Sequence, residues 1–278
     1  MSAPGPVELA SAGLRRVPDR AGMTRVVARI LARDGRCADP QRCARSGAEA
    51  ILPAALGLVH RRCRIRRRPD GAVPPAPRRT VRAGWELTAV VVHVGRWEVT
   101  HWLARCLERA GGDPRARAGG DGARLEPSAG RSCGGVQVGG GEGRAGKDGL
   151  RAPDASATAD ALARLRIDAA DLSAWARAGA DPNDIHLRPG AARSAGLAVG
   201  GDEAVAHGLL LAALSLAVVP LRARGVDLRF TAPVAVPLAG GPAMVAVTGR
   251  GDLADRWGTA LRRVAPPADG GAGDADGA

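Results

Sequence analysis

The sequence contains no tyrosine, one phenylalanine and, among its 40 basic residues, a single lysine, Lys147. Aromatic side chains usually supply much of the area that a protein core buries. The core of this 278-residue chain must therefore consist mainly of Ala, Val and Leu, which bury less area per residue. Because hydrophobic residues still make up 45% of the chain, one large domain or two ordinary domains can form.

Membrane-spanning segments and secretory patterns are also missing. The charge-free run LLLAALSLAVV is well short of the ~20 residues that span a bilayer. The N-terminal stretch MSAPGPVELASAGLRR lacks a basic start followed by an apolar region, so we expect no signal peptide. The cysteines are odd in number and show no CxxC spacing, which indicates neither a zinc site nor a disulfide framework. We expect a cytoplasmic protein with no membrane partner.

Charge and glycine patterns narrow the possible ligands. A net charge of +12 favours anionic ligands, such as the phosphate groups of coenzyme A or of a carrier protein. Nucleic-acid binding is a minor alternative, because basic charge without a recognisable motif is non-specific. Gly141, Gly143 and Gly146 satisfy GxGxxG but follow no clear strand and begin no helix. We therefore expect no cofactor.

Composition divides the chain into five segments. Residues 111–160 contain almost no large apolar side chains and cannot bury enough surface to offset the entropy of ordering. We expect an N-terminal arm (1–21), a first domain (22–112), a disordered linker (113–160), a second domain (161–264) and a disordered tail (265–278).

Periodicity in the first half predicts one helix and several strands. Thr24–Arg33 carries apolar residues at helical spacing, and Trp85–Leu103 has the pattern of a β-hairpin that turns at Gly95-Arg96. From Arg62 to Arg66, arginines alternate with Cys63 and Ile65, as in a half-buried strand. We interpret the arginines as a solvated sheet face, with phosphate contact as the alternative. His93 and His101 lie in the hairpin and are assigned to structure.

The second half has stronger signals. Asp168 or Asp171 can cap a helix that contains Leu172, Trp175 and Ala176 on one face. An apolar helix is expected from about His207 to Val219, ended by Pro220. Strands that could wrap this helix are expected at Leu162–Ile167, Val226–Phe230, Ala243–Thr248 and Trp257–Val264.

The segment between these two helices carries the candidate chemistry. Asp181-Pro182-Asn183-Asp184 combines the residue types that stabilise turns, so Asp181 and His186 should converge. Gly208 begins the apolar helix, where the first N–H groups have no partners within the helix and lie at the positive end of its dipole. Negative charge developing on a substrate oxygen would be stabilised there.

These residues resemble a known family. The series DPNDIH (Asp181–His186), PGAARSAGL, Ala206-His207-Gly208 and VDLRFTAPVAVPLAG is similar in type and order to MaoC-like acyl dehydratases, the (R)-specific enoyl-CoA hydratases with a hotdog fold. The segment LPAALGLVHRRCRI resembles the degenerate first half of two-domain members. The resemblance implies an α+β double hotdog, with two antiparallel sheets each wrapped around a central helix. It also implies a monomer with an internal pseudo-dimer, or a homodimer.

The resemblance further implies (R)-specific hydration of trans-2-enoyl thioesters, or the reverse dehydration of 3-hydroxyacyl thioesters, on coenzyme A or a carrier protein. Asp181 and His186 would be catalytic and the Gly208 N–H would bind the oxyanion, while Asn183 fixes the turn and His207 braces the helix entrance. Asp184 replaces the family's proline, and a second carboxylate beside the site would raise the pKa of one of the two. A non-catalytic acyl-binding subunit is the main alternative. No metal is expected.

Overall fold

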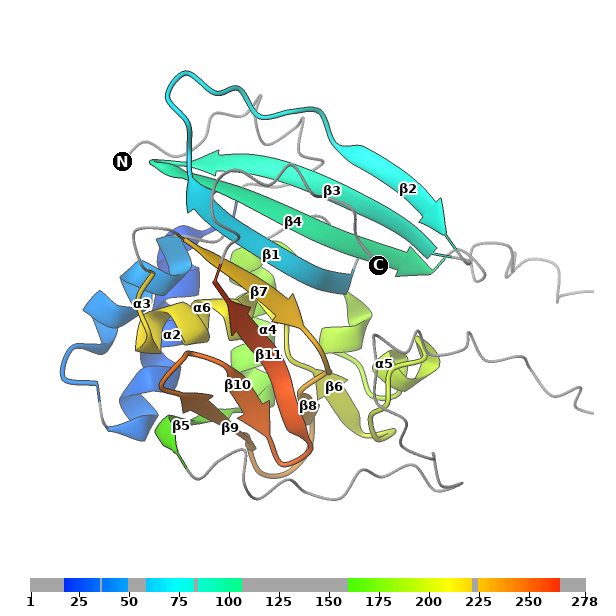
Figure 1. The fold of residues 1–278 in the computed structure, drawn as a ribbon. Helices are drawn as coiled ribbons and strands as arrows, with labels where there is room; N and C mark the ends of the chain where they lie inside the picture. Colours follow the sequence, from blue (N-terminus) through cyan, green and yellow to red (C-terminus); the bar gives the residue numbers. More distant parts are fainter. Residues whose placement is uncertain are drawn as a thin grey trace, which may run out of the picture.

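The computed structural model describes residues 18–35, 37–49, 59–82, 85–106, 160–221 and 225–265. These form a mixed fold in which a large antiparallel sheet curves over a group of helices (Figure 1). The expected arm, linker and tail lie almost entirely outside the described residues. In the part of the chain that is described, no helix combines the length and apolar character needed to cross a membrane.

The large sheet has nine strands in the order β2-β3-β4-β1-β7-β11-β10-β9-β5. A separate two-stranded sheet pairs β6 with β8. The strands are β1 (Val59–Arg67), β2 (Arg78–Arg82), β3 (Trp85–Val94), β4 (Trp97–Cys106), β5 (Ala161–Ile167), β6 (Glu203–Val205), β7 (Val226–Phe230), β8 (Ala235–Pro237), β9 (Ala243–Thr248), β10 (Leu253–Asp255) and β11 (Gly258–Val264).

The main sheet is continuous across the two halves, so the antiparallel α+β character is confirmed, whereas the finer expectation of two sheets, each wrapped around a central helix, is not. Strand β1 of the first half pairs antiparallel with β7 of the second, with Cys63 opposite Leu228 and Ile65 opposite Val226. Two separate sheets would each leave an unpaired edge at this point, with backbone groups open to other chains. Pairing β1 with β7 satisfies both edges.

Helix α6 (Gly208–Val218) lies at the centre of the second half. Its residues from Leu209 to Ala217 are all buried, as its uninterrupted apolar sequence predicts. Strand β1 and helix α3 (Pro40–Glu49) both pack against it, so both halves contribute to its surroundings. Residues 50–58, which follow α3, lie outside the described residues, and the first half's own central helix is therefore not established.

Helix α2 (Arg20–Asp34) packs against elements of the second half, namely α4 (Ala169–Gly179) and β5. Its partner there is Asp171, a fully buried carboxylate that accepts hydrogen bonds from Arg29 at 2.6 Å and Arg33 at 2.7 Å. Asp171 also closes the capping box of α4 with Asp168, so both candidate capping residues take part. This ionic cluster fixes the start of the helix whose far end leads to the candidate site.

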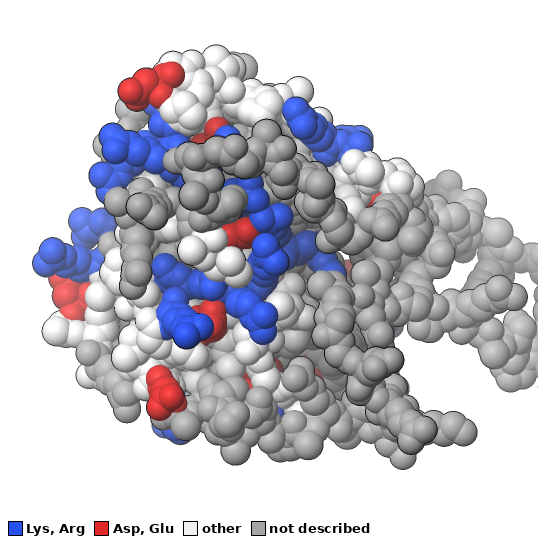
Figure 2. Space-filling view, in the orientation of Figure 1, with Lys and Arg blue, Asp and Glu red and all other residues white. Residues whose placement is uncertain are grey.

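The arginines of β1 lie on the outer face of the sheet, as the alternation predicted. Cys63 and Ile65 are fully buried on the other face. Asp227 on β7 is buried among the arginines and accepts hydrogen bonds from Arg62 at 2.8 and 3.0 Å. Arginines gather over the middle of the sheet, with a few acidic side chains between them (Figure 2).

Candidate active site

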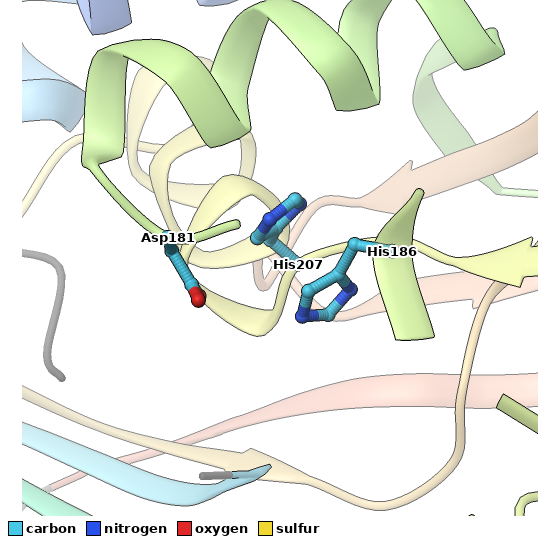
Figure 3. A group of neighbouring side chains, drawn as sticks. All are labelled: Asp181, His186 and His207. Atoms are coloured by element: carbon cyan, nitrogen blue, oxygen red, sulfur yellow. The ribbon is translucent and has the colours of Figure 1, made fainter. Parts of the chain in front are cut away.

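The candidate site begins where α4 ends. Ala180 adopts a left-handed conformation (φ 54°) and caps the helix, and the N–H of Asp181 donates to the carbonyl of Ala176 at 3.0 Å. Glycine adopts this conformation without steric cost, so the alanine here carries about 1 kcal/mol of strain. The left-handed residue reverses the chain and turns Asp181 toward the start of α6 (Figure 3).

The turn that follows is held as the sequence predicted. The side chain of Asn183 accepts a hydrogen bond from the N–H of Ile185 at 3.3 Å and caps the short 3-10 helix Asp184–His186. Ile185 is buried and anchors this helix in a small apolar cluster with Ala192 and Val205. The structure therefore places Asn183 as a turn residue and directs His186 inward.

His186 is held in one tautomer by β6. Its Nδ1 lies 2.6 Å from the carbonyl oxygen of Val205, which can only accept, so Nδ1 carries the proton and Nε2 keeps its lone pair. Burial lowers the pKa of His186 to about 4, although the Val205 carbonyl opposes this shift. His186 is therefore neutral near pH 7 and can accept a proton at Nε2.

Asp181 is the nearby carboxylate and is 9% exposed. Its Oδ1 is buried and has no hydrogen-bond partner among the described residues. Burial raises the pKa of Asp181 to about 6, and the backbone N–H of Asn183 opposes the shift. The raised pKa of Asp181 does not come from Asp184, contrary to the sequence expectation. The side chain of Asp184 is 55% exposed and pairs with Arg188 at 3.1 Å.

His207 completes the group. Its ring stacks on that of His186, with centroids 3.6 Å apart and an interplanar angle of 23°. Burial, and secondarily His186, lowers its pKa well below the usual value. Side-chain atoms of Asp181, His186 and His207 lie within 4.8 Å of one another (Figure 3). His207 stands at the entrance of α6, where it is the N-cap residue, although its side chain makes no capping hydrogen bond.

Two histidines and a carboxylate at this separation could bind a metal ion, but the stacked rings oppose it. An imidazole nitrogen binds a metal ion along its in-plane lone pair. In two stacked, nearly parallel rings these lone pairs lie in two separate, nearly parallel planes, so one nearby ion cannot lie in both planes. Nδ1 of His186 is already held by Val205. The arrangement fits proton transfer better than metal binding.

Gly208 begins α6 beside this group. In the described part of the chain, no side chain caps the helix start, so its first N–H groups remain available to a ligand. A Cβ at Gly208 would lie 3.2 Å from Cβ of His60 and 3.3 Å from the ring of Phe230. Glycine therefore permits a close approach here that a larger residue would disturb.

Sequence reasoning did not single out His60 and assigned His101 to structure. His60 is partly buried beside Gly208, and its ring makes an edge contact with that of His101, with centroids 5.6 Å apart. One signal was present, since His60 lies within LPAALGLVHRRCRI, the segment that carries the resemblance in the first half. The alternation seen from Arg62 to Arg66, if continued back to His60, would point this side chain outward, and nothing in the sequence reveals the bulge in β1 that turns it inward.

Comparison with known proteins gives only distant similarities. No family model matches the chain, and no curated protein matches it. The structure of HtdX from Mycobacterium tuberculosis is similar over 92% of this chain and 91% of its own, at 18% identity and a TM-score of 0.45. A MaoC-like dehydratase is similar over 90% and 94% at 16% identity and a TM-score of 0.41.

Full-length peroxisomal multifunctional enzyme type 2 from Drosophila melanogaster matches 94% of this chain and 52% of its own, with 16% identity and a TM-score of 0.41. The chain thus resembles structures of MaoC-like dehydratases along most of its length. At these identities and TM-scores, a functional assignment has to rest on the site itself.

Proposed function

We propose that the protein catalyses (R)-specific hydration of trans-2-enoyl thioesters, or the reverse dehydration of 3-hydroxyacyl thioesters. The observation that carries this proposal is the meeting of Asp181 and His186 beside the uncapped start of α6. Both side chains are proton acceptors near pH 7, one as a carboxylate and the other through Nε2. The (R) configuration and the thioester substrate are supported by the sequence resemblance.

Two acceptors can hold one water molecule by its two hydrogens. Their separation within 4.8 Å suits a single bridging water, since each hydrogen bond spans about 2.8 Å. The water's free lone pair then points away from both groups, toward C3 of the substrate. As the C3–O bond forms, the electrons of the double bond shift toward the thioester oxygen, and Asp181 takes a water proton that it then delivers to C2.

The start of α6 would stabilise the charge on the thioester oxygen. The N–H of Gly208 would donate to this oxygen, at the positive end of the helix dipole. One such donor contributes about 3 kcal/mol in comparable enzymes. Gly208→Ala should lower kcat, because the added Cβ would crowd His60 and Phe230 and displace the helix start.

The test is hydration of crotonyl-CoA, followed by loss of the enoyl thioester absorbance, with the product's configuration determined. We expect (R)-3-hydroxybutyryl-CoA, and Asp181→Asn and His186→Ala should each lower kcat by about 100-fold or more. Asp184→Asn is the matched control and should keep the wild-type rate, because that carboxylate faces solvent. Absence of turnover with acyl chains of several lengths, on coenzyme A and on a carrier protein, would contradict the proposal.

A further inference from the structure

A bulge in β1 brings a histidine of the first half into the site. The pairing of β1 with β4 shifts between His60 and Arg62, so that His60 lies opposite Leu103 while Cys63 lies opposite His101. Residues directly opposite each other in an antiparallel pair point to the same face. His60 therefore shares the inner face with Leu103 and His101, although plain alternation would place it with Arg62 outside.

His60 connects the candidate site to His101. On one side it packs against Gly208 and makes an edge contact with Phe230, with ring centroids 6.1 Å apart. On the other side its ring meets His101. Burial, followed by His101 and His186, lowers the pKa of His60 well below the usual value. His60 thus lies between the helix start at Gly208 and the ring of His101.

The ring nitrogens of His101 and His60 include buried atoms that lack hydrogen-bond partners within the ranges that the structure describes. His101 is 1% exposed, and neither of its ring nitrogens has a hydrogen-bond partner among the residues described. Nε2 of His60 is also buried without one. Buried polar atoms without partners destabilise a fold, and an apolar side chain would avoid that cost. A ligand that forms hydrogen bonds with these nitrogens would account for both histidines.

We infer that His60 and His101 form a second subsite, which binds a neutral oxygen substituent on the acyl chain, a hydroxyl or keto group farther from the thioester than C3. This rests on the proposed function, which puts the thioester oxygen at Gly208. Burial lowers the pKa of His101 to about 4, so its ring is neutral and both donates and accepts. Neutral rings suit a hydroxyl or keto oxygen better than a carboxylate, whose charge would lack a counter-ion.

The test compares matched substrates. We would measure kcat/KM for trans-2-octenoyl-CoA and for its 5-hydroxy and 7-hydroxy derivatives. The wild-type protein should prefer a hydroxylated chain by about tenfold, the effect of one or two hydrogen bonds to substrate. His101→Leu should abolish this preference while changing turnover of the plain chain by no more than about threefold. His93→Leu is the control, because that buried ring lies in the same half beside Glu98, at 3.7 Å.

The outcomes separate the two proposals. Turnover that favours the plain chain, with no effect of His101→Leu on selectivity, would overturn the subsite and leave the hydratase intact. An equal loss on all substrates would make His101 a positioning residue and also overturn it. No turnover of any substrate would overturn both proposals. Should His101→Leu fail to fold, His101→Gln provides the same comparison, because it removes the ring nitrogens while keeping a polar side chain.

Discussion

At the scale of single residues, the site depends on opposite effects of burial on an acid and a base. Burial raises the pKa of Asp181 to about 6 and lowers that of His186 to about 4, since it disfavours the charged form of each. Between these values both groups are neutral. Above about pH 6 the carboxylate forms while His186 stays neutral, which is the state that can accept both hydrogens of a water molecule.

The pH dependence of hydration follows from this. We expect kcat/KM to rise with pH through about 6, as Asp181 ionises, and to stay level above pH 7. His186 sets no limit there, because its pKa of about 4 keeps the ring neutral throughout. Initial rates with crotonyl-CoA from pH 5 to 8 provide the measurement. A rate that is flat or falls across this range would mean that ionised Asp181 is not the working form.

Sequence reasoning reached much of the site at this scale. Asp181 and His186 were expected to converge from turn chemistry, and their side chains do lie together, with His207 as the third member of the group. Gly208 follows His207 as the first residue of α6, as the apolar helix predicted. Asp184 was expected beside them and is not, because the short helix it begins turns its side chain toward solvent. His60 was missed because a single inserted residue in β1 reverses the side to which it points.

At the scale of secondary-structure elements, long periodic segments were predictable and short ones were not. Val226–Phe230 and Ala243–Thr248 are strands with the expected bounds, and the apolar helix runs from Gly208 to Val218. Strands β6, β8 and β10 went unrecognised, because three residues are too few to show alternation. Strands β6 and β8 pair with each other across about 30 residues of sequence, whereas β10 pairs with its two neighbours in the chain, β9 and β11.

The stability of the pairing between β1 and β7, here called the seam, should depend on Asp227. The side chain of Asp227 is 2% exposed, and that of its partner Arg62 is 27% exposed. Asp227→Asn should lower the free energy of unfolding by about 2–3 kcal/mol, because it leaves partly buried arginines without their counter-charge. Urea unfolding measures this. Asp184→Asn, which breaks an exposed ion pair, should cost less than about 1 kcal/mol. Equal losses in the two variants would show that the buried carboxylate does not hold the seam.

At the scale of the whole molecule, the joining of the halves could not be predicted from the sequence. Strand β1 has an expected inner face, but its second partner, β7, lies far along the chain beyond a long segment without periodicity. The two strands pair because the backbone N–H and C=O groups at their edges need hydrogen-bond partners. Local sequence patterns do not indicate which distant strand supplies these partners. The same joining brings His60 and His101 of the first half to the site in the second.

The buried histidines should make the fold sensitive to acid. In His101 and His186, folding lowers the pKa from about 6.5 to about 4, so their full contribution to stability is present above pH 6.5 and is lost as pH falls through 4. For His101 alone this amounts to about 3 kcal/mol. Asp181 acts in the opposite sense, since its raised pKa contributes stability at low pH that is lost as pH rises through 6.

Urea midpoints between pH 7 and pH 4 test this balance. The midpoint should fall toward pH 4, and His101→Leu should flatten that fall because it removes one of the groups that must take up a proton. A wild-type midpoint that stays constant over this range would show that the buried rings do not carry the predicted linkage.

The most direct test of the central claim, that Asp181 and His186 act together on one water, is a double-mutant cycle in crotonyl-CoA hydration. Groups that act as a unit give non-additive losses. We predict that the Asp181→Asn/His186→Ala double variant has the same residual kcat/KM as the slower single variant. Losses that multiply in the double variant, or single variants as active as the wild type, would contradict the account.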